Sequence, residues 1–402
     1  MTGNTAVCEV CLSSQIGPVV DFGFHPLNDD MRKVGTDREI KKYQQKIVLC
    51  ENCLTAHQVA PVPKEILFFP EYRYRGSLTR DVTNGMEDLV NSVLAFMGEK
   101  KLTVLDIGAN DGTLLKIFSS KSPDIKTIGI DPTDIVLSEN TGIDFPYQSF
   151  FNAESATRIL NEHGKPDVIT FTNVFAHIEN LSELIEALDL LLSSNNLVVI
   201  ENHYLGSVLE KNQFDTFYAE HLRTYSSKSF EFIAKRLNCE IVRLEFPKRY
   251  GGNIRVFLSR KKFPSTLNET SNEIDIVGSF TNLQKVYDDW KSDSQVKLEK
   301  LASNSILLGK SCPARSVMLF SSLGLDSSVM PFVYEQPTSA KLGFYVPGTS
   351  IEVVSDDLFP RGSKLPLILW SWHIAYEVLP YLRKNLDFKG EVWSPLPNFT
   401  KI

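Results

Sequence analysis

The sequence predicts an α/β protein built on a doubly wound parallel sheet, with a small metal-binding module in front of it. Two C-x-x-C pairs lie within the first 53 residues. Apolar strands then alternate with helical stretches from residue 103 to residue 201, and a glycine-containing loop joins the first strand to its helix. A chain of 402 residues exceeds what one hydrophobic core usually organises, so we expect three domains.

The composition is that of a packed globular chain, with 43% hydrophobic and 23% charged residues. The net charge of -7 and the lack of a long Lys or Arg run argue against nucleic acid or an anionic membrane as a partner. Met1–Val10 has no signal-peptide pattern, and the apolar segment Leu365–Trp372 is too short to span a bilayer. We therefore expect a cytoplasmic protein with no membrane insertion.

The first element is a cluster of four cysteines, Cys8, Cys11, Cys50 and Cys53. Two C-x-x-C knuckles can close a tetrahedron of thiolates around Zn²⁺, and in a cytosolic chain this pattern favours metal over disulfides. A closed four-sulfur site has no open coordination position, so we interpret the metal as structural. The alternative is a redox dithiol or two coincidental pairs. Cys239 and Cys312 stand alone and are expected to be small buried hydrophobes.

The next element is a strand, loop and helix that is typical of a cofactor site. The apolar strand Thr103–Ile107 enters the loop Gly108–Gly112, and a helical pattern starts at Thr113. A second strand, Ile125–Ile130, ends in Asp131, where a carboxylate can accept both hydroxyls of a ribose. Together they predict a nucleotide-like cofactor.

The loop distinguishes between two cofactors. A dinucleotide needs a G-x-G-x-x-G turn, whereas this loop reads Gly108-Ala-Asn-Asp-Gly112. Asp106 and Asp111 would repel a pyrophosphate but suit the amino group and sulfonium of S-adenosylmethionine. A similar fold with a vacant or different site is the alternative. The candidate cofactor-binding residues are Asp106, Gly108, Asn110, Asp111, Gly112, Asp131, Phe151 and Asn173.

The parallel sheet is expected to continue with two strands, each preceded by a helix. The predicted strands are Asp167–Thr172 and Asn196–Glu201, and the helices are Ala153–Leu160 and Leu181–Leu192. Polar residues follow both strands, in Asn173–Ile178 and Asn202–Tyr204, so catalytic groups are expected at these strand ends. Two later strands, Glu240–Phe246 and Asn253–Ser259, would add an antiparallel edge.

The segment from Gln213 to Ser226 contains the residues best suited to proton transfer. If it is helical, Tyr218, His221 and Tyr225 share one face. Histidine is the usual general base near neutral pH, and tyrosine hydroxyls can donate to a developing oxyanion. The alternative is that these side chains only pack in the core.

The chain resembles the three-part sugar C-methyltransferases that act on nucleotide-linked 4-keto sugars. The similarity rests on the double C-x-x-C, Tyr72-Arg-Tyr-Arg-Gly-Ser77, Val104-Leu-Asp-Ile-Gly-Ala-Asn-Asp-Gly-Thr113, Asn173-Val-Phe-Ala-His177, Asn212-Gln-Phe-Asp-Thr-Phe-Tyr-Ala-Glu-His221 and Tyr250-Gly-Gly-Asn-Ile-Arg-Val256. It implies that His221 removes the C-3 proton of the sugar and that the resulting enolate attacks the cofactor methyl group. The supporting catalytic residues would be Tyr218, Glu220, His177 and the Tyr72/Tyr74 pair.

The resemblance also implies the domain organisation. It places a zinc-binding domain at residues 1–74, a class I methyltransferase domain at 75–260 and a second Rossmann-like α/β domain at 261–402. Pro264–Glu273 is the expected linker, and Phe280–Leu301 the expected first helix of the last domain. There are departures: Ala219 replaces a histidine of many relatives, and Ser311–Ser316 replaces a glycine-rich loop, so a second ligand site looks degraded.

The expected partner is a nucleotide diphosphate sugar bound by a monomer or small homo-oligomer. Its diphosphate could meet Lys341, Arg73, Arg75 and Arg80, although ordinary surface charge is an equal alternative for these residues. Two other functions stay open. One is O- or N-methylation of a sugar nucleotide, and the other is a cofactor-binding scaffold without catalysis.

Overall fold

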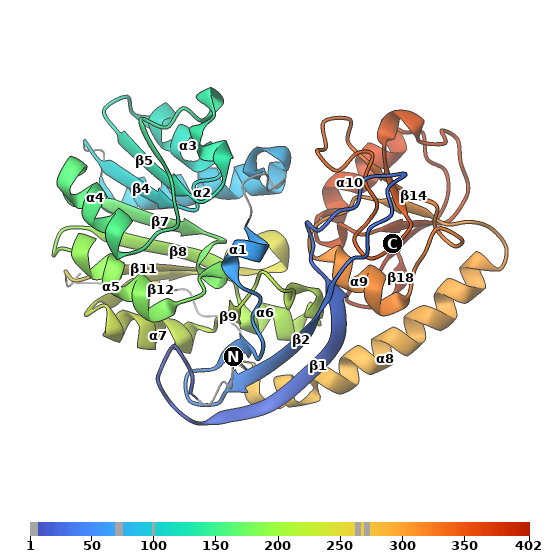
Figure 1. The fold of residues 1–402 in the computed structure, drawn as a ribbon, viewed down its shortest axis with the longest axis horizontal. Coiled ribbons are helices and arrows are strands. Elements are labelled where there is room, and N and C mark those ends of the chain that lie inside the picture. Colours follow the sequence, from blue (N-terminus) through green and yellow to red (C-terminus); the bar gives the residue numbers. More distant parts are fainter. Residues whose placement is uncertain (1–6, 69–74, 99–100, 262–266, 269–273) are drawn as a thin grey trace.

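The computed structural model describes residues 7–68, 75–98, 101–261, 267–268 and 274–402. Within these residues the chain forms three sheets (Figure 1). The central sheet and the C-terminal sheet make the two halves of the molecule, and a curved N-terminal sheet runs below both. The α/β fold predicted from the sequence is confirmed. The predicted linker lies almost wholly outside the described residues.

The central sheet has the order β12-β10-β11-β8-β7-β4-β5-β6. Its five parallel strands are β4 (Thr103–Ile107), β5 (Lys126–Asp131), β6 (Phe145–Gln148), β7 (Val168–Thr172) and β8 (Leu197–His203). The predicted antiparallel edge is present as β11 (Asn253–Ser259), which pairs with β8, and β10 (Glu240–Glu245), with β12 (Leu267–Asn268) outermost. The parallel strands all end at one edge, where a doubly wound sheet binds its ligand.

Helices cover both faces of the central sheet because its strands are apolar on both sides. Leu105 and Ile107 of β4 belong to one buried cluster and Val104 to another. The first cluster packs against α4 (Ala153–His163), α5 (Leu181–Leu191) and α7 (Ser227–Arg236), and the second against α2 (Arg80–Met97) and α3 (Thr113–Lys121). The sheet is therefore the middle layer of a three-layer unit.

The N-terminal sheet has four antiparallel strands. They are β1 (Ile16–Pro26), β2 (Lys42–Cys50), β3 (Thr55–Gln58) and β9 (Arg223–Thr224), and the short helix α1 (Lys64–Leu67) follows β3. Strand β9 comes from the middle of the chain and begins two residues after His221. The N-terminal sheet is thus paired directly with the candidate catalytic segment.

The C-terminal sheet confirms the second Rossmann-like unit, because its strand order is β15-β14-β13-β16-β17-β18. The strands are β13 (Leu308–Lys310), β14 (Phe332–Glu335), β15 (Glu352–Ser355), β16 (Leu367–Leu369), β17 (Val392–Ser394) and β18 (Thr400–Lys401). The helices are α9 (Ser316–Leu323), α10 (Ala375–Lys384) and the long α8 (Ile276–Ala302), which confirms the helix predicted over Phe280–Leu301.

One buried cluster joins the N-terminal sheet, the C-terminal sheet and the segment that follows β8 of the central sheet. It contains Phe22 of β1, Phe214 and Phe217 from the middle of the chain, Trp290 of α8 and Trp370 after β16. Helix α6 (Leu205–Glu210) also packs into it through Leu205 and Val208. This shared core holds the carboxyl edge of the central sheet opposite the C-terminal sheet.

The middle of Gln213–Ser226 is not helical, so the shared helical face considered from the sequence does not form. Only one 3₁₀ turn, Phe214–Thr216, is present, and Arg223–Thr224 is a strand. Tyr218 and His221 still lie together, with ring centroids 4.2 Å apart, but Tyr225 is fully buried against Phe175 and Phe230. Tertiary contacts thus override the local helical pattern.

Candidate active site

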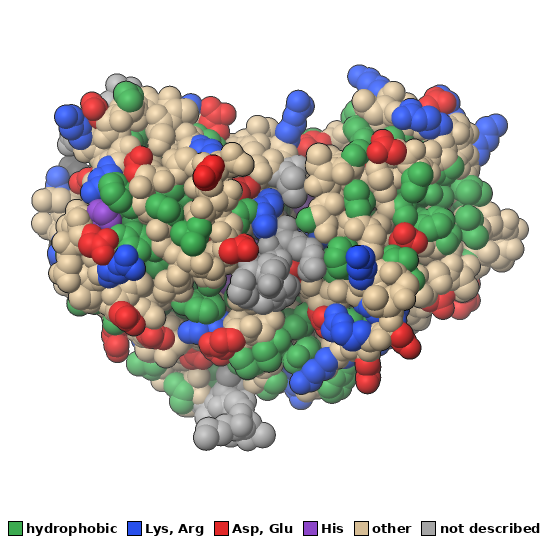
Figure 2. All heavy atoms as spheres, turned by 45° about the horizontal axis from the view of Figure 1, so that its top comes forward, with side chains coloured by type: hydrophobic (Ala, Val, Ile, Leu, Met, Phe, Trp, Pro, Cys, Tyr) green, Lys and Arg blue, Asp and Glu red, His purple; other side chains and the backbone are tan. Residues whose placement is uncertain are grey.

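A cavity of about 1050 Å³ separates the carboxyl edge of the central sheet from the C-terminal sheet. Asp106, Asp131 and His221 line it from one side, and Arg315 and His373 line it from the other. A notch between the two halves is visible in the space-filling view, where acidic and basic side chains are interspersed over the exposed face (Figure 2). The cavity is large enough for two small molecules to meet.

The loop between β4 and α3 needs its two glycines. Gly108 and Gly112 have φ angles of +77° and +72°, which L side chains rarely adopt. A Cβ atom on Gly108 would lie 2.4 Å from Val174 Cγ2, and one on Gly112 would lie 2.4 Å from the carbonyl oxygen of Thr141. The loop can therefore approach a ligand only with glycine at these positions.

Three carboxylates surround this loop. Burial raises the pKa of Asp106 to about 7, and its Oδ1 accepts a hydrogen bond from Thr170 at 2.7 Å. Burial also raises the pKa of Asp131, whose Oδ2 accepts the Asn110 N–H at 2.9 Å. For Asp111 burial acts in the same direction, but hydrogen bonds from Thr113 and Ser77 outweigh it and lower the pKa. Near pH 7 Asp106 is thus only partly ionised, whereas Asp111 is ionised.

The structure brings most of the predicted cofactor residues to the cavity. Those that line it are Asp106, Gly108, Asn110, Asp111, Asp131, Phe151 and Asn173. Gly112 does not line it and instead precedes the first turn of α3. Asn173 has a φ of +54°, and its Oδ1 accepts a hydrogen bond from Asn253 at 3.2 Å. All predicted cofactor-binding residues except Gly112 therefore line the same cavity.

His221 is held in one tautomer. Its Nδ1 lies 2.8 Å from the carbonyl oxygen of Thr216, and because a carbonyl only accepts, Nδ1 carries the proton. Nε2 of the neutral ring then keeps its lone pair. His221 is only 4% exposed and lines the cavity. A neutral imidazole in this tautomer can accept a proton at Nε2.

Two further histidines surround His221. The ring of His177 lies 5.0 Å from that of His221, and the ring of His203 lies 5.1 Å from it. Burial lowers the pKa of His177 to about 4. Burial, together with neighbouring histidines and Arg315, lowers the pKa values of His203 and His221 well below 6.5. The lowered pKa values leave all three rings neutral near pH 7.

The other predicted catalytic residues are placed as follows. Tyr218 and Glu220 line the same cavity, and Glu220 Oε1 is 3.4 Å from Asn28 Nδ2 of the N-terminal part. Tyr72 and Tyr74 lie outside the described residues. The proposed base and three of its predicted partners therefore converge on one cavity.

Among the cavity residues to which the sequence analysis gave no role are His203, Tyr250, Arg315 and His373. His203 ends β8, and the polar run after that strand was a usable signal. Tyr250 belongs to a motif that carried the family resemblance, but without a role. Arg315 and His373 come from the C-terminal part, and no local pattern connects them with a site more than 90 residues away.

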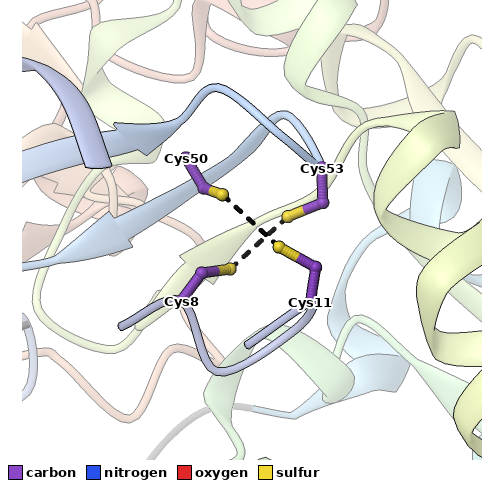
Figure 3. A group of neighbouring side chains, drawn as sticks. All are labelled: Cys8, Cys11, Cys50 and Cys53. Carbon is purple, nitrogen blue, oxygen red and sulfur yellow. Dashed lines mark hydrogen bonds between the residues drawn. The ribbon is translucent and has the colours of Figure 1, made fainter. Parts of the chain in front are cut away.

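The four N-terminal cysteines point toward a common centre (Figure 3). Their sulfur atoms all lie within 4.8 Å of one another, with Cys8 to Cys53 at 3.4 Å and Cys11 to Cys50 at 3.6 Å. A tetrahedral site with metal–sulfur bonds of about 2.3 Å has edges of about 3.8 Å. The cluster therefore fits a metal ion, which is consistent with a zinc-binding module.

Among the described residues, no helix combines the length and hydrophobicity needed to cross a bilayer.

Comparisons with known proteins add two family matches. A model described as methyltransferase domain matches residues 78–244, and one described as C-methyltransferase C-terminal domain matches residues 248–397. The C-methyltransferase NovU of Streptomyces niveus is 23% identical to this chain over 407 aligned residues, covering 97% of this chain and 95% of that protein.

Solved structures of methyltransferases also match the chain. A methyltransferase of Anabaena variabilis described as dependent on S-adenosylmethionine is 18% identical, covers 44% of this chain and 86% of its own, and has a TM-score of 0.36. The plantazolicin methyltransferase BpumL with a triazolic analog and SAH is 16% identical, covers 46% and 87%, and has a TM-score of 0.36.

Proposed function

We propose that the chain is an S-adenosylmethionine-dependent C-methyltransferase whose acceptor is C-3 of a nucleotide-linked 4-keto-deoxysugar. The observation that carries this proposal is the hydrogen bond between His221 Nδ1 and the Thr216 carbonyl, which leaves Nε2 as a base facing the cavity. Methylation of carbon needs such a base because a C–H bond must first become a carbanion equivalent. A neighbouring ketone makes that proton acidic enough.

The cofactor is proposed to lie along the loop after β4. Asp131 would accept the ribose hydroxyls, and the acidic groups Asp106 and Asp111 would face the amino group and sulfonium. When bound, S-adenosylmethionine supplies an electrophilic methyl group, and the electron pair of the broken carbon–sulfur bond stays on sulfur. Gly108, Asn110, Phe151 and Asn173 would complete the surface around it, with Gly112 shaping the loop.

The proposed chemistry starts at His221. Nε2 takes the C-3 proton, and the electron pair of the C–H bond delocalises onto the C-4 oxygen as an enolate. Neutral His177 and Tyr218 line the same cavity and can donate hydrogen bonds to that oxygen. Glu220 would orient the base, and Tyr72 or Tyr74 remains a further proposed donor. The enolate carbon then forms the new C–C bond and the ketone returns.

The nucleotide diphosphate is proposed to bind near the basic residues of the cavity. Arg75, Arg80 and Lys341 line it, and Lys341 comes from the C-terminal half. Guanidinium and ammonium groups match phosphate oxygens. Arg73, also predicted for this role, lies outside the described residues. We further propose that the protein works in the cytoplasm, as a monomer or small homo-oligomer, in the synthesis of branched sugars.

The N-terminal metal is proposed to be Zn²⁺ with a structural role. Cys8, Cys50 and Cys53 are fully buried, and four sulfur ligands leave no position for substrate.

The test is methyl transfer from labelled S-adenosylmethionine to a panel of 4-keto-6-deoxy sugar nucleotides, followed by mass spectrometry and NMR of the product. We expect a methyl group on carbon with the wild type and none with His221→Asn. His163→Asn is the control, because His163 of α4 does not line the cavity. Methylation only at oxygen or nitrogen, or none with any 4-keto sugar, would overturn the proposal.

A further inference from the structure

The segment that carries the Thr216 carbonyl is anchored by the C-terminal half. Arg315, just before α9, forks onto Asp215, with Nε to Oδ2 at 2.8 Å and Nη2 to Oδ1 at 2.6 Å. The same Nη2 donates to Thr216 Oγ1 at 3.0 Å. Two parallel N–H···O bonds of this kind fix the geometry as well as the charge pairing. The neighbouring residues 215 and 216 are thus held by one guanidinium from 100 positions away.

A second residue of the C-terminal half completes the anchor. Trp372 donates its indole N–H to Asp215 Oδ2 at 2.9 Å, and the Arg315 guanidinium lies 5.0 Å from the centre of the same indole. Asp215 and Thr216 are fully buried and Arg315 is 5% exposed. Because water is excluded, these hydrogen bonds hold their geometry more firmly than surface contacts would.

The anchored segment is also what sets the tautomer of His221. Its Nδ1–H donates to the Thr216 carbonyl, so the place and direction of that carbonyl decide which ring nitrogen keeps the lone pair. Two consecutive contacts thus link the guanidinium to the imidazole. Arg315 holds Asp215 and Thr216, and the Thr216 carbonyl holds His221, which lines the cavity.

We propose that Arg315 is a positioning residue, which fixes the orientation and tautomer of His221 through Asp215 and Thr216. The catalytic base is then complete only when the C-terminal half is docked. The segment Ser311–Ser316, interpreted from the sequence as a degraded ligand loop, then serves to position Arg315. The effect on catalysis rests on the proposed function of His221, whereas the effect on its tautomer does not.

The test uses the full chain with ¹⁵N-labelled histidine, and the His221 signals are identified with His221→Asn. Three variants weaken the anchor. Arg315→Lys keeps the charge but loses the fork, and Trp372→Phe removes one N–H donor while keeping a ring under the guanidinium. The double variant Asp215→Asn/Arg315→Gln removes both charges together, so no buried charge is left unpaired. Arg383→Lys is the matched control, because Arg383 donates only to the carbonyls of Phe388 and Gly390 within the C-terminal half.

In the wild type we expect His221 as the Nδ1–H tautomer alone. In the anchor variants we expect a mixture with the Nε2–H form, and a kcat about 100-fold lower in the double variant, because a small misplacement of a catalytic group has effects of that order. KM and cofactor affinity stay unchanged. Trp372→Phe is expected to give the smallest loss of kcat, and it requires the least rearrangement of the surrounding core.

Two results would overturn the proposal. One is an unchanged tautomer in all three variants. The other is a loss of kcat that only follows the melting temperature and is equalled by Arg383→Lys, since that is the behaviour of a purely structural ion pair. A shifted tautomer in a protein whose wild type transfers no methyl group would support the positioning and refute the proposed function instead.

Discussion

Neutral histidines are the most distinctive side chains of the cavity. Burial lowers the pKa values of His221 and His203 well below 6.5, and that of His177 to about 4. The charged groups that face His221 are Arg315 and its partner Asp215, with Glu220 in the adjacent chain segment. A base works only when it is unprotonated, so a lowered pKa extends activity toward acid.

We therefore predict that kcat/KM for the sugar substrate, at saturating S-adenosylmethionine, stays level from pH 8 down through pH 6.5 and declines only well below it. The measurement is a pH profile of kcat/KM for methyl transfer. Enzyme held at each acidic pH and then assayed at pH 7.5 controls for loss of metal or unfolding. An acidic limb centred at 6.5 or above would show that His221 is solvated, or that another group is the base.

Single residues also show how far sequence patterns reach into a site. Asp106, Asp131 and Asn173 could be predicted because each lies at or near the carboxyl end of a recognisable strand. Arg315 could not, because its partner Asp215 lies 100 positions earlier and only the folded chain brings them together. Tyr225 was misjudged for the same reason: its face depends on a backbone that tertiary contacts bend out of a helix.

Among the elements, the loop from β4 to α3 offers a direct test. Gly112→Ala combines a strained φ with a contact to the Thr141 carbonyl, whereas Gly164 has a φ of +77° and nothing within 4 Å of an added Cβ. We predict that Gly112→Ala raises the cofactor Kd about tenfold or more, which is about 1.4 kcal/mol, while Gly164→Ala costs only the backbone strain of about 1–2 kcal/mol in stability. Calorimetric titration and thermal melting measure both. Equal effects of the two variants would contradict this account.

The cysteine cluster is connected to the candidate base through strand pairing. Strand β3 pairs with β9, and Gln58 of β3 donates its backbone N–H to the Leu222 carbonyl at 2.9 Å, next to His221. The Cys53 carbonyl also accepts hydrogen bonds from Ser226 and Ser229 at 3.2 Å. Loss of the metal would therefore loosen the segment that carries the base.

We predict that chelation or Cys11→Ser lowers stability by about 3 kcal/mol or more, which is about 6–12 °C in Tm, and lowers methyl transfer in parallel. Metal content, Tm and activity are measured on the same samples. Cys239→Ser is the control, since Cys239 is also buried but is not one of the four clustered cysteines, and the carbonyl of Leu237 can accept a hydrogen bond from the new hydroxyl. Full methyl-transfer activity without metal would show that the cysteine cluster does not support the candidate active site.

Element boundaries followed the sequence wherever apolar periodicity was strong. Strand β4 has the predicted limits, and α8 extends the predicted helix by four residues at its start and one at its end. The segment Gln213–Ser226 failed because its conformation is set by Arg315, Trp372 and β3 rather than by its own side-chain pattern.

The N-terminal and C-terminal sheets share one buried cluster with α6, the helix that follows β8 of the central sheet, so we expect all three sheets to unfold together. Trp290 of α8 lies 4.6 Å from the ring of Phe214 and donates to the Pro395 carbonyl at 2.7 Å. We predict that Trp290→Ala costs about 3–5 kcal/mol and moves a single calorimetric transition to lower temperature. Val296→Ala, on the same helix but 66% exposed, leaves it in place. Two resolved transitions, with only one shifted, would show independent domains.

The acidic wall of the cofactor loop has a consequence for turnover. Methyl transfer converts a sulfonium cation into a neutral thioether, so the attraction of Asp106 and Asp111 for the proposed cofactor weakens to that for its amino group when the reaction is complete. Because the pKa of Asp106 is about 7, its ionised fraction grows as the pH rises through neutrality, and the preference for the cation grows with it. We therefore expect the spent cofactor to bind more weakly than the charged cofactor, which favours its release after each turnover.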